Sequence, residues 1–162
     1  MKIAICPGSF DPITLGHLNI IRRAAKIFDH VIVCVTVNHE KHPLFNLDER
    51  VELVRRVIER FPNVEADTSD ILLAEYARQK GATVVLKGLR AVSDFEKEFQ
   101  LANINKKLNP DLDTVFLTAS EKYTYLSSSV VREMARYGAD LREFVPHEIM
   151  ADIIEKTKSR RN

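Results

Sequence analysis

Residues 2–17, KIAICPGSFDPITLGH, run from an apolar segment through a loop into the start of a helix. The apolar segment 2–6 is short and followed by glycine and proline, which is typical of a buried strand. The loop brings two glycines, two prolines, two hydroxyls, an aspartate and a histidine into eleven positions. From residue 16 to 28 the apolar side chains fall on one helical stripe. A strand, a loop and a helix in this order predict the first unit of a parallel α/β sheet.

The same alternation continues along the chain. We expect strands at residues 2–6, 31–37, 64–68, 83–86 and 114–118, helices at 16–28, 47–61, 71–80 and 92–108, a short helix near 128–137 and a last one from residue 146. Five alternations predict a single Rossmann-like, doubly wound α/β domain over residues 1–162, with a five-stranded parallel sheet in the order 3-2-1-4-5. The polar end of the chain, from about residue 155, is expected to be a mobile tail.

Composition and charge exclude several classes of protein. The 162 residues are 45% hydrophobic and 29% charged, with a net charge of +1, so we expect no general attraction to nucleic acid or membrane. The longest apolar run, residues 31–37, is too short to cross a bilayer. Cys6 and Cys34 lie in apolar runs, which favours buried thiols and a cytoplasmic location.

Residues suited to anion binding follow the first strand. In the predicted sheet order the winding reverses between the first and fourth strands, and ligands bind there at the carboxyl ends. Gly8 and Ser9 follow the strand, and Gly16 and His17 begin the helix. Glycines let backbone amides approach phosphate oxygens, and a helix start adds free N–H donors. A lone histidine at a helix start would more often bond a nearby carbonyl, but this loop favours a role at the anion.

The fourth strand is followed by a second charged segment. Lys87 offers a compact charge and Arg90 a planar fork, a pair suited to one polyphosphate or two phosphates, although a solvated basic edge is the ordinary alternative. On the next helix Asp94 and Glu98 share a face. Glu96 is expected to face solvent.

The fifth strand is followed by Ser127, Ser128 and Ser129. One serine suffices to cap a helix, so three suggest donors to phosphate. Tyr123 and Tyr125 are expected either to stack on a nucleotide base or to pack against the rest of the protein. After the second strand Lys41 can reach a second anion. His39 and His42 have no third ligand nearby, so we expect no metal held by the protein.

Three common signatures are missing from the sequence. It contains no GxxxxGK[ST], no GxGxxG and no GxSxG, which argues against a P-loop NTPase, a dinucleotide fold and an α/β-hydrolase. Phosphate-binding groups, one histidine and no obvious nucleophile favour direct phosphoryl or nucleotidyl transfer by positioning and charge stabilisation.

Two of these motifs, TLGH at 14–17 and SSSVVRE at 127–133, resemble signatures of the nucleotidyltransferase superfamily. With KGLRAVSDFEKEFQLANIN at 87–105, the chain resembles the bacterial phosphopantetheine adenylyltransferase family from about residue 3 to about residue 146. This resemblance implies in-line transfer of the adenylyl group of ATP to 4'-phosphopantetheine, giving dephospho-coenzyme A and pyrophosphate, with Mg²⁺ accompanying ATP. It also implies a homohexamer inhibited by coenzyme A.

The resemblance also implies the residue roles. His17 would be catalytic by stabilising charge on the α-phosphate. The ATP-binding residues would be Ser9, Phe10, His17, Gly88, Leu89, Arg90, Glu98, Tyr123, Thr124, Tyr125, Leu126, Ser127, Ser128 and Ser129. The residues for phosphopantetheine would be Ser9, Lys41, Leu73 and Lys87. Many relatives have Thr at the position of Ser9, so the hydroxyl is kept here. Many have Arg at the position of Lys87, so the positive charge is kept but the planar guanidinium, which can make two hydrogen bonds to one phosphate, is lost.

Two other functions remain open. A nicotinamide-mononucleotide adenylyltransferase or another small nucleotidyltransferase would share the fold, but those enzymes usually have His where this chain has Thr14. A nucleotide-binding sensor without catalysis is the second alternative. A sensor needs no second anion site, so Lys41 and Lys87 argue against it.

Overall fold

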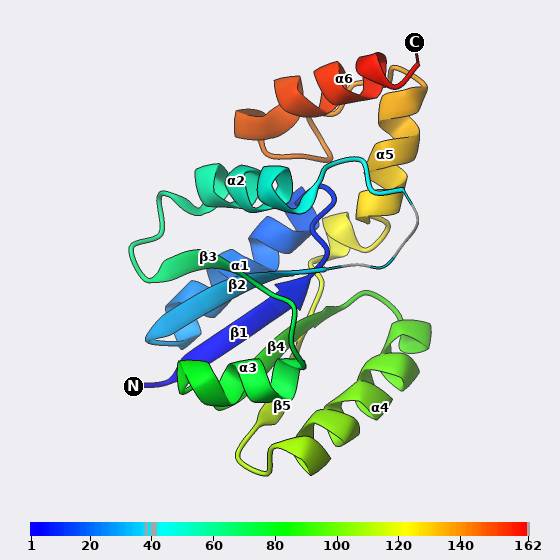
Figure 1. Cartoon of the computed structure of the whole chain (residues 1–162). Coiled ribbons are helices and arrows are strands. Elements are labelled where there is room, and N and C mark those ends of the chain that lie inside the picture. Colours follow the sequence, from blue (N-terminus) through cyan, green and yellow to red (C-terminus); the bar gives the residue numbers. More distant parts are fainter. Residues whose placement is uncertain (38, 40–41, 162) are drawn as a thin grey trace.

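The computed structural model describes residues 1–37, 39 and 42–161. The strands are β1 (Ile3–Gly8), β2 (His30–Thr36), β3 (Val64–Ser69), β4 (Val84–Leu89) and β5 (Asp113–Thr118). The helices are α1 (Leu15–Ile27), α2 (Leu47–Ile58), α3 (Leu73–Lys80), α4 (Val92–Leu108), α5 (Ser128–Arg136) and α6 (Met150–Ser159), with short 3₁₀ turns η1 (Glu121–Tyr123) and η2 (His147–Ile149). All strands pair in parallel in the order β3-β2-β1-β4-β5, which confirms the predicted sheet (Figure 1).

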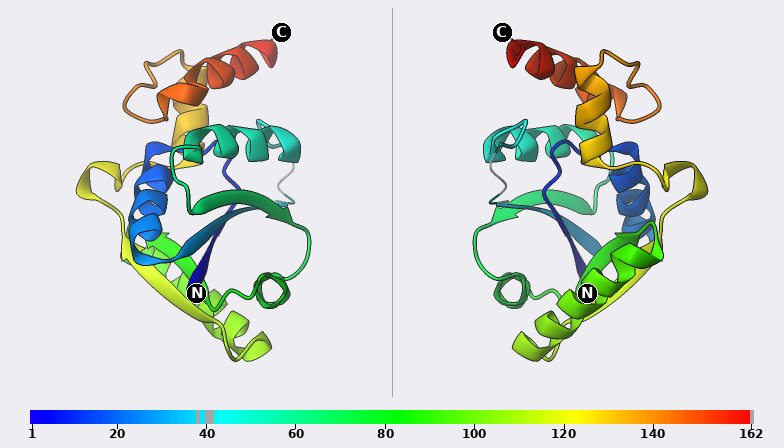
Figure 2. Two further views of the ribbon diagram at one scale, coloured as in Figure 1. Left: turned by 90° about the vertical axis from the view of Figure 1, so that its left-hand side faces the viewer. Right: turned by 90° about the vertical axis from the view of Figure 1, so that its right-hand side faces the viewer.

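Helices cover both faces of the sheet. α1 and α2 pack on one face, and α5 and α6 extend that layer, whereas α3 and α4 lie on the other face (Figures 1 and 2). Alternate residues of the central strands supply the two layers, since Ile5 faces α3 and Cys6 faces α1. Both faces of β1 and β2 are therefore buried, which explains their continuous apolar sequence. Among the described helices, none is long and apolar enough to cross a membrane.

Local signals fix several helix ends. Asn46 and Glu49 form a capping box at the start of α2, as their spacing predicts. Gly81 ends α3 with a φ of 66°, a conformation that suits glycine because it has no Cβ.

Two strands continue at least two residues past their predicted ends. β1 continues to Gly8, which pairs with Val35, and β4 continues to Leu89, which pairs with Thr118. The apolar pattern ends earlier in both strands, but the neighbouring strand still offers backbone partners. Lys87 is therefore a strand residue rather than a loop residue.

Most of the segment expected to form a mobile tail, from about residue 155, is helical. α6 continues to Ser159, and Thr157 is 6% exposed. The Lys156 ammonium lies 2.7 Å from the Glu49 carboxylate on α2. A buried residue and an ion pair thus hold a stretch whose polar composition suggested fraying.

Candidate active site

The carboxyl ends of β1, β4 and β5 surround two adjoining cavities. The larger, about 410 Å³, is lined among others by Thr14, His17, Lys87, Arg90, Asp94, Glu98, Tyr123 and Ser127. The smaller, about 220 Å³, is lined by Ser9, Phe10, Asp11, His17, Pro43, Arg50, Ser128, Ser129 and Arg132. His17, Phe10 and Ser128 line both cavities. The imidazole therefore stands where the two cavities meet.

His17 is held at the start of α1 by the residue that caps the helix. The Thr14 backbone N–H donates to His17 Nδ1 at 3.0 Å, and the His17 N–H donates to Thr14 Oγ1 at 3.3 Å. These two bonds form a capping box in which histidine takes the place usually filled by glutamate. The ring of Phe10 packs edge-on against the imidazole, with 5.0 Å between the ring centroids. The side chain is thus fixed before any ligand arrives.

The same hydrogen bonds determine the tautomer of His17. Because Nδ1 accepts from a backbone N–H, a neutral ring carries its proton on Nε2. Burial, and secondarily the charge of Arg90, lower the pKa of His17 to about 4. Near neutral pH the ring is therefore a neutral donor through Nε2–H.

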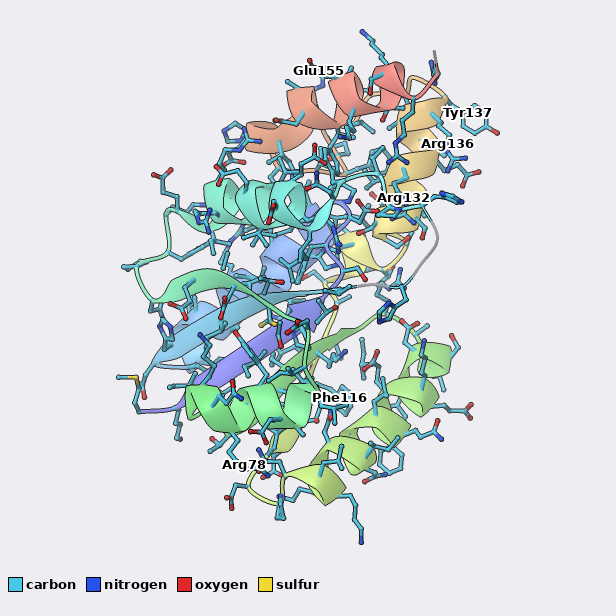
Figure 3. All side chains as sticks on the ribbon, viewed as in Figure 1. Arg78, Phe116, Arg132, Arg136, Tyr137 and Glu155 are labelled. Atoms are coloured by element: carbon cyan, nitrogen blue, oxygen red, sulfur yellow. The ribbon has the colours of Figure 1, made fainter. Side chains whose placement is uncertain are left out.

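The first loop is tied down by segments from distant parts of the chain. The Asp11 carboxylate accepts from the Leu44 and Phe45 backbone N–H groups, both at 2.9 Å. Arg132 donates to the Asp11 carbonyl at 2.7 Å, and Ser128 Oγ donates to the Pro12 carbonyl at 2.7 Å. Figure 3 shows Arg132 on the part of α5 nearest the sheet, with Arg136 and Tyr137 farther along the helix.

Strain is stored in this loop at Phe10. Its φ of 48° lies in the left-handed region that favours glycine, and its side chain is only 4% exposed. A Cβ on Gly8 would lie 3.0 Å from the Phe10 ring, so glycine is needed for this approach. Backbone and ring together leave the loop little freedom beside His17.

Lys87 faces Glu98 across the larger cavity. Its ammonium lies 3.2 Å from the Glu98 carboxylate, and both side chains are partly exposed. Next along β4, a Cβ on Gly88 would lie 3.0 Å from the Ile20 side chain, so glycine lets β4 and α1 approach closely. Lys87, which the resemblance assigns to phosphopantetheine, and Glu98, which it assigns to ATP, therefore form an ion pair with each other in the structure.

Arg90 is oriented by two groups. Its guanidinium donates to the Leu126 carbonyl at 3.0 Å and lies 3.5 Å from the Asp94 carboxylate. This holds the arginine between the end of β4 and the segment before α5, on the wall of the larger cavity.

The three serines at the start of α5 have separate partners. Ser127 caps the helix by accepting from the Val130 N–H at 3.2 Å, Ser128 bonds to Pro12, and Ser129 accepts from Arg132 at 3.2 Å. Helix capping, the alternative explanation for these serines, thus accounts for Ser127 alone. The first N–H groups of α5 still have no partner within the helix, and they suit an anion.

Most predicted site residues lie together. Those lining at least one cavity are Ser9, Phe10, His17, Lys87, Gly88, Arg90, Glu98, Tyr123, Leu126, Ser127, Ser128 and Ser129. Four other predicted residues line neither cavity, namely Leu73, Leu89, Thr124 and Tyr125. Leu73 packs against the core beneath α3, and Tyr125 packs edge-on against Phe144. Lys41 falls outside the described residues.

Sequence reasoning missed Arg50, Arg132 and Asp11 as parts of the site. Arg132 lies within a motif that was noted for its serines, and Asp11 within the quoted loop. Arg50 had a subtler signal, because it falls on the apolar stripe of α2 with Leu53 and Val57. A charged residue on a buried helical face indicates a specific role.

The described residues argue against two further kinds of chemistry, a cysteine nucleophile and a metal held by the protein. Burial raises the pKa of the Cys6 thiol at the cavity wall to about 12, so it stays protonated. No group of three or more His, Cys, Asp or Glu side chains suited to a metal occurs in the described part of the chain.

Comparison with known proteins gives the family of the chain and supports its fold. Residues 5–134 match the model of the cytidylyltransferase-like family. A Vibrio parahaemolyticus protein, provisionally named a nicotinate-nucleotide adenylyltransferase, aligns with a TM-score of 0.68 at 19% identity over 96% of both chains. The Plasmodium falciparum nicotinic acid mononucleotide adenylyltransferase aligns with a TM-score of 0.65 at 14% identity over 99% of this chain and 96% of that one. At such low identity these structures support the fold alone.

The chain belongs to the cytidylyltransferase-like family, and within it to the phosphopantetheine adenylyltransferases. It is 54% identical to the phosphopantetheine adenylyltransferase of Caldanaerobacter subterraneus over 98% of this chain and 99% of the relative. It is 52% identical to that of Alkaliphilus metalliredigens over 97% of this chain and the whole of the relative.

Proposed function

We propose that the protein transfers the adenylyl group of ATP to 4'-phosphopantetheine and releases dephospho-coenzyme A and pyrophosphate. The observation that carries this proposal is the position of His17 between two cavities lined by cations and hydroxyls. Adenylyl transfer needs two anionic groups brought together at one phosphorus, with charge stabilisation where they meet. The identity to named phosphopantetheine adenylyltransferases supports the choice of acceptor.

His17 acts in this proposal as a neutral hydrogen-bond donor. In this role the Nε2–H donates to the α-phosphate oxygens, where charge develops as the acceptor phosphate attacks. A donor fixed before the reaction costs no reorganisation when that charge appears. With the Cys6 thiol protonated, direct in-line transfer without a covalent enzyme intermediate is the mechanism that fits.

The larger cavity suits the nucleotide and the acceptor phosphate. Arg90 and the start of α5 are placed to hold ATP phosphates, and Tyr123 lies where a base or ribose can pack. Lys87 is placed to bind the phosphate of phosphopantetheine in exchange for Glu98. Glu98 is then free to accept a hydrogen bond from the nucleotide.

Mg²⁺ is proposed to arrive as part of the ATP substrate. The carboxylates of the larger cavity do not fit a metal held by the protein, because Glu98 faces Lys87 and Asp94 faces Arg90. ATP phosphates offer the hard oxygen ligands that Mg²⁺ prefers.

Assembly, regulation and location complete the proposal. The exposed apolar side chains of α4, including Phe99, Ile104 and Leu108, suit contacts between copies, in keeping with a homohexamer. Feedback by coenzyme A is proposed because it contains the phosphopantetheine that the site would bind. The free, buried cysteines are in keeping with a cytoplasmic location.

The deciding experiment measures pyrophosphate release from ATP and Mg²⁺ with separate acceptors. Phosphopantetheine, nicotinamide mononucleotide and glycerol 3-phosphate are each offered to the purified protein. Release with phosphopantetheine alone is the expected result. Release with another acceptor would show that the protein is a nucleotidyltransferase with a different acceptor substrate. No release with any acceptor would favour a nucleotide-binding sensor.

A further inference from the structure

Arg50 is a buried cation on a helical face that otherwise packs into the core. It lies on α2 with its side chain 3% exposed, beside the buried Leu53, Val54 and Val57. Arginine is rarely buried to this extent unless it is paired.

The guanidinium of Arg50 joins the ends of two strands. One terminal nitrogen donates to the Ser9 carbonyl at 2.8 Å and to the Thr36 carbonyl at 3.2 Å. Ser9 directly follows β1, and Thr36 is the last residue of β2. Arg50 thus fixes the start of the first loop, whose other end carries His17.

No carboxylate neutralises Arg50 among the residues that the structure describes. It forms no ion pair there, and its Nε is buried without a hydrogen-bond partner. Arg56, on the same helix, instead lies 2.8 Å from the Asp152 carboxylate. Burying a charge without a counter-ion costs several kcal/mol. Such a cost points to an anion that arrives with the reaction.

The smaller cavity provides the place for that anion. Arg50 lines it together with Arg132, Ser128 and Ser129. Its one described carboxylate, Asp11, accepts two backbone N–H groups and lies 3.7 Å from Arg132. The cavity is therefore lined by two cations and the start of a helix, but by only one described carboxylate, whose hydrogen bonds are already made. Its electrostatic potential should be positive.

We propose that Arg50 is a positioning residue for the departing pyrophosphate, acting by fixing the Ser9 end of the first loop and by making the smaller cavity positive. This inference rests on the proposed adenylyl transfer. In that step an acceptor phosphate oxygen forms a bond to the α-phosphorus, and the bond from the α-phosphorus to the bridging oxygen breaks. Pyrophosphate leaves with that oxygen and the electron pair. His17 borders both cavities, so pyrophosphate can enter the smaller cavity as the new bond forms in the larger one.

The test titrates inorganic pyrophosphate with Mg²⁺ into the full chain by calorimetry. We expect Arg50→Met to weaken pyrophosphate binding about tenfold or more, because a positive charge that lines the cavity is lost. Binding of adenosine, which has no phosphate, should stay within about twofold. Arg56→Met removes the same charge from the same helix outside the site, so it should lower stability and leave pyrophosphate affinity unchanged.

Arg50→Lys separates charge from positioning and covers the case in which Arg50→Met does not fold. Lysine keeps the charge but cannot reproduce the planar fork. Pyrophosphate affinity should therefore stay within about threefold of the parent, while kcat falls about tenfold at unchanged KM for ATP.

Two results would overturn the inference: unchanged pyrophosphate affinity in Arg50→Met, or unchanged kcat in Arg50→Lys. The pyrophosphate titration needs no acceptor, so it is independent of the substrate assignment, whereas kcat is measured with whichever acceptor supports pyrophosphate release. If Arg50→Met weakens pyrophosphate binding while phosphopantetheine supports no pyrophosphate release, the inference stands and the proposed acceptor is wrong.

Discussion

The two walls of the larger cavity are built differently. One wall comprises the first loop and the start of α1, where His17 is held by Thr14 and the loop by Asp11 and Arg132. The other wall is α4, which supplies Asp94 and Glu98 but buries none of its residues. Figure 1 shows α4 at the edge of the molecule, packed on one side only.

This difference separates two tasks. In the proposed mechanism, His17, the group that meets developing charge, lies on the wall held by long-range bonds and a strained backbone. The carboxylates that would exchange partners when substrates bind lie on α4, the wall that a single chain leaves exposed. Stabilising a transition state requires fixed geometry, whereas accepting substrates requires contacts that can change.

The largest effect is expected on the fixed wall. His17→Ala should lower kcat by about 10²-fold or more while ATP affinity changes little, because the lost donor acts on charge present mainly in the transition state. Steady-state kinetics and an ATP titration measure both values. His30→Ala, on β2 away from both cavities, is the control. Loss of ATP affinity at unchanged kcat would contradict the assigned role.

A pH effect on stability should come from the same residue. With its pKa lowered from 6.5 to about 4, His17 favours folding in its neutral form. Its contribution is fully present above pH 6.5 and is lost as pH falls toward 4. Between pH 7.5 and pH 5 the loss should be roughly 2 kcal/mol in the free energy of unfolding.

Denaturant titrations of the parent and His17→Asn at both pH values isolate this contribution. The variant should lose less stability on acidification, by that amount. An equal loss in both proteins would mean that His17 is protonated in the fold, and the neutral-donor mechanism would then be wrong.

A smaller effect is expected where the two walls face each other. Lys87→Ala should raise KM for phosphopantetheine about tenfold, the value of one charged hydrogen bond to its phosphate. KM for ATP should change less. Initial rates over both substrates give the two constants, and a defect confined to ATP would reassign Lys87 to the nucleotide.

The smallest effect is expected on the exposed wall. Ile104 on α4 is 47% exposed, and Ile21 on α1 is 1% exposed. In the monomer, Ile104→Ala should change the free energy of unfolding by less than about 0.5 kcal/mol, whereas Ile21→Ala should lose about 3 kcal/mol. Denaturation over a range of protein concentrations tests the pair. The proposed contacts between copies predict that the loss for Ile104→Ala increases with concentration, so a loss that stays small at every concentration would contradict them.

The sequence was most informative where local chemistry follows a regular element. The alternation of strands and helices predicts the sheet order, and the rule that ligands bind at the switch point selects the segments that carry His17, Lys87 and Arg90. These predictions need only side-chain periodicity and sequence position. The structure places all three residues around one cavity.

It was least informative where partners are distant in the chain. The extension of β4 depends on β5, the order of α6 depends on α2, and the pairing of Lys87 with Glu98 depends on how α4 returns to the sheet. Arg50 was missed for the same reason, since its carbonyl partners lie in two other segments. No local pattern encodes such contacts.

The ties on the first loop have a consequence for synthesis on the ribosome. Asp11 and Pro12 find their partners in Arg132 and Ser128, which are made more than a hundred positions later. β1, at the centre of the sheet, likewise pairs with β4 only after β4 has been made. A nascent chain that ends before α5 therefore carries His17 without the contacts that hold the first loop. In the proposed mechanism, competence for catalysis is acquired only after α5 has been made, long after the segment that carries His17.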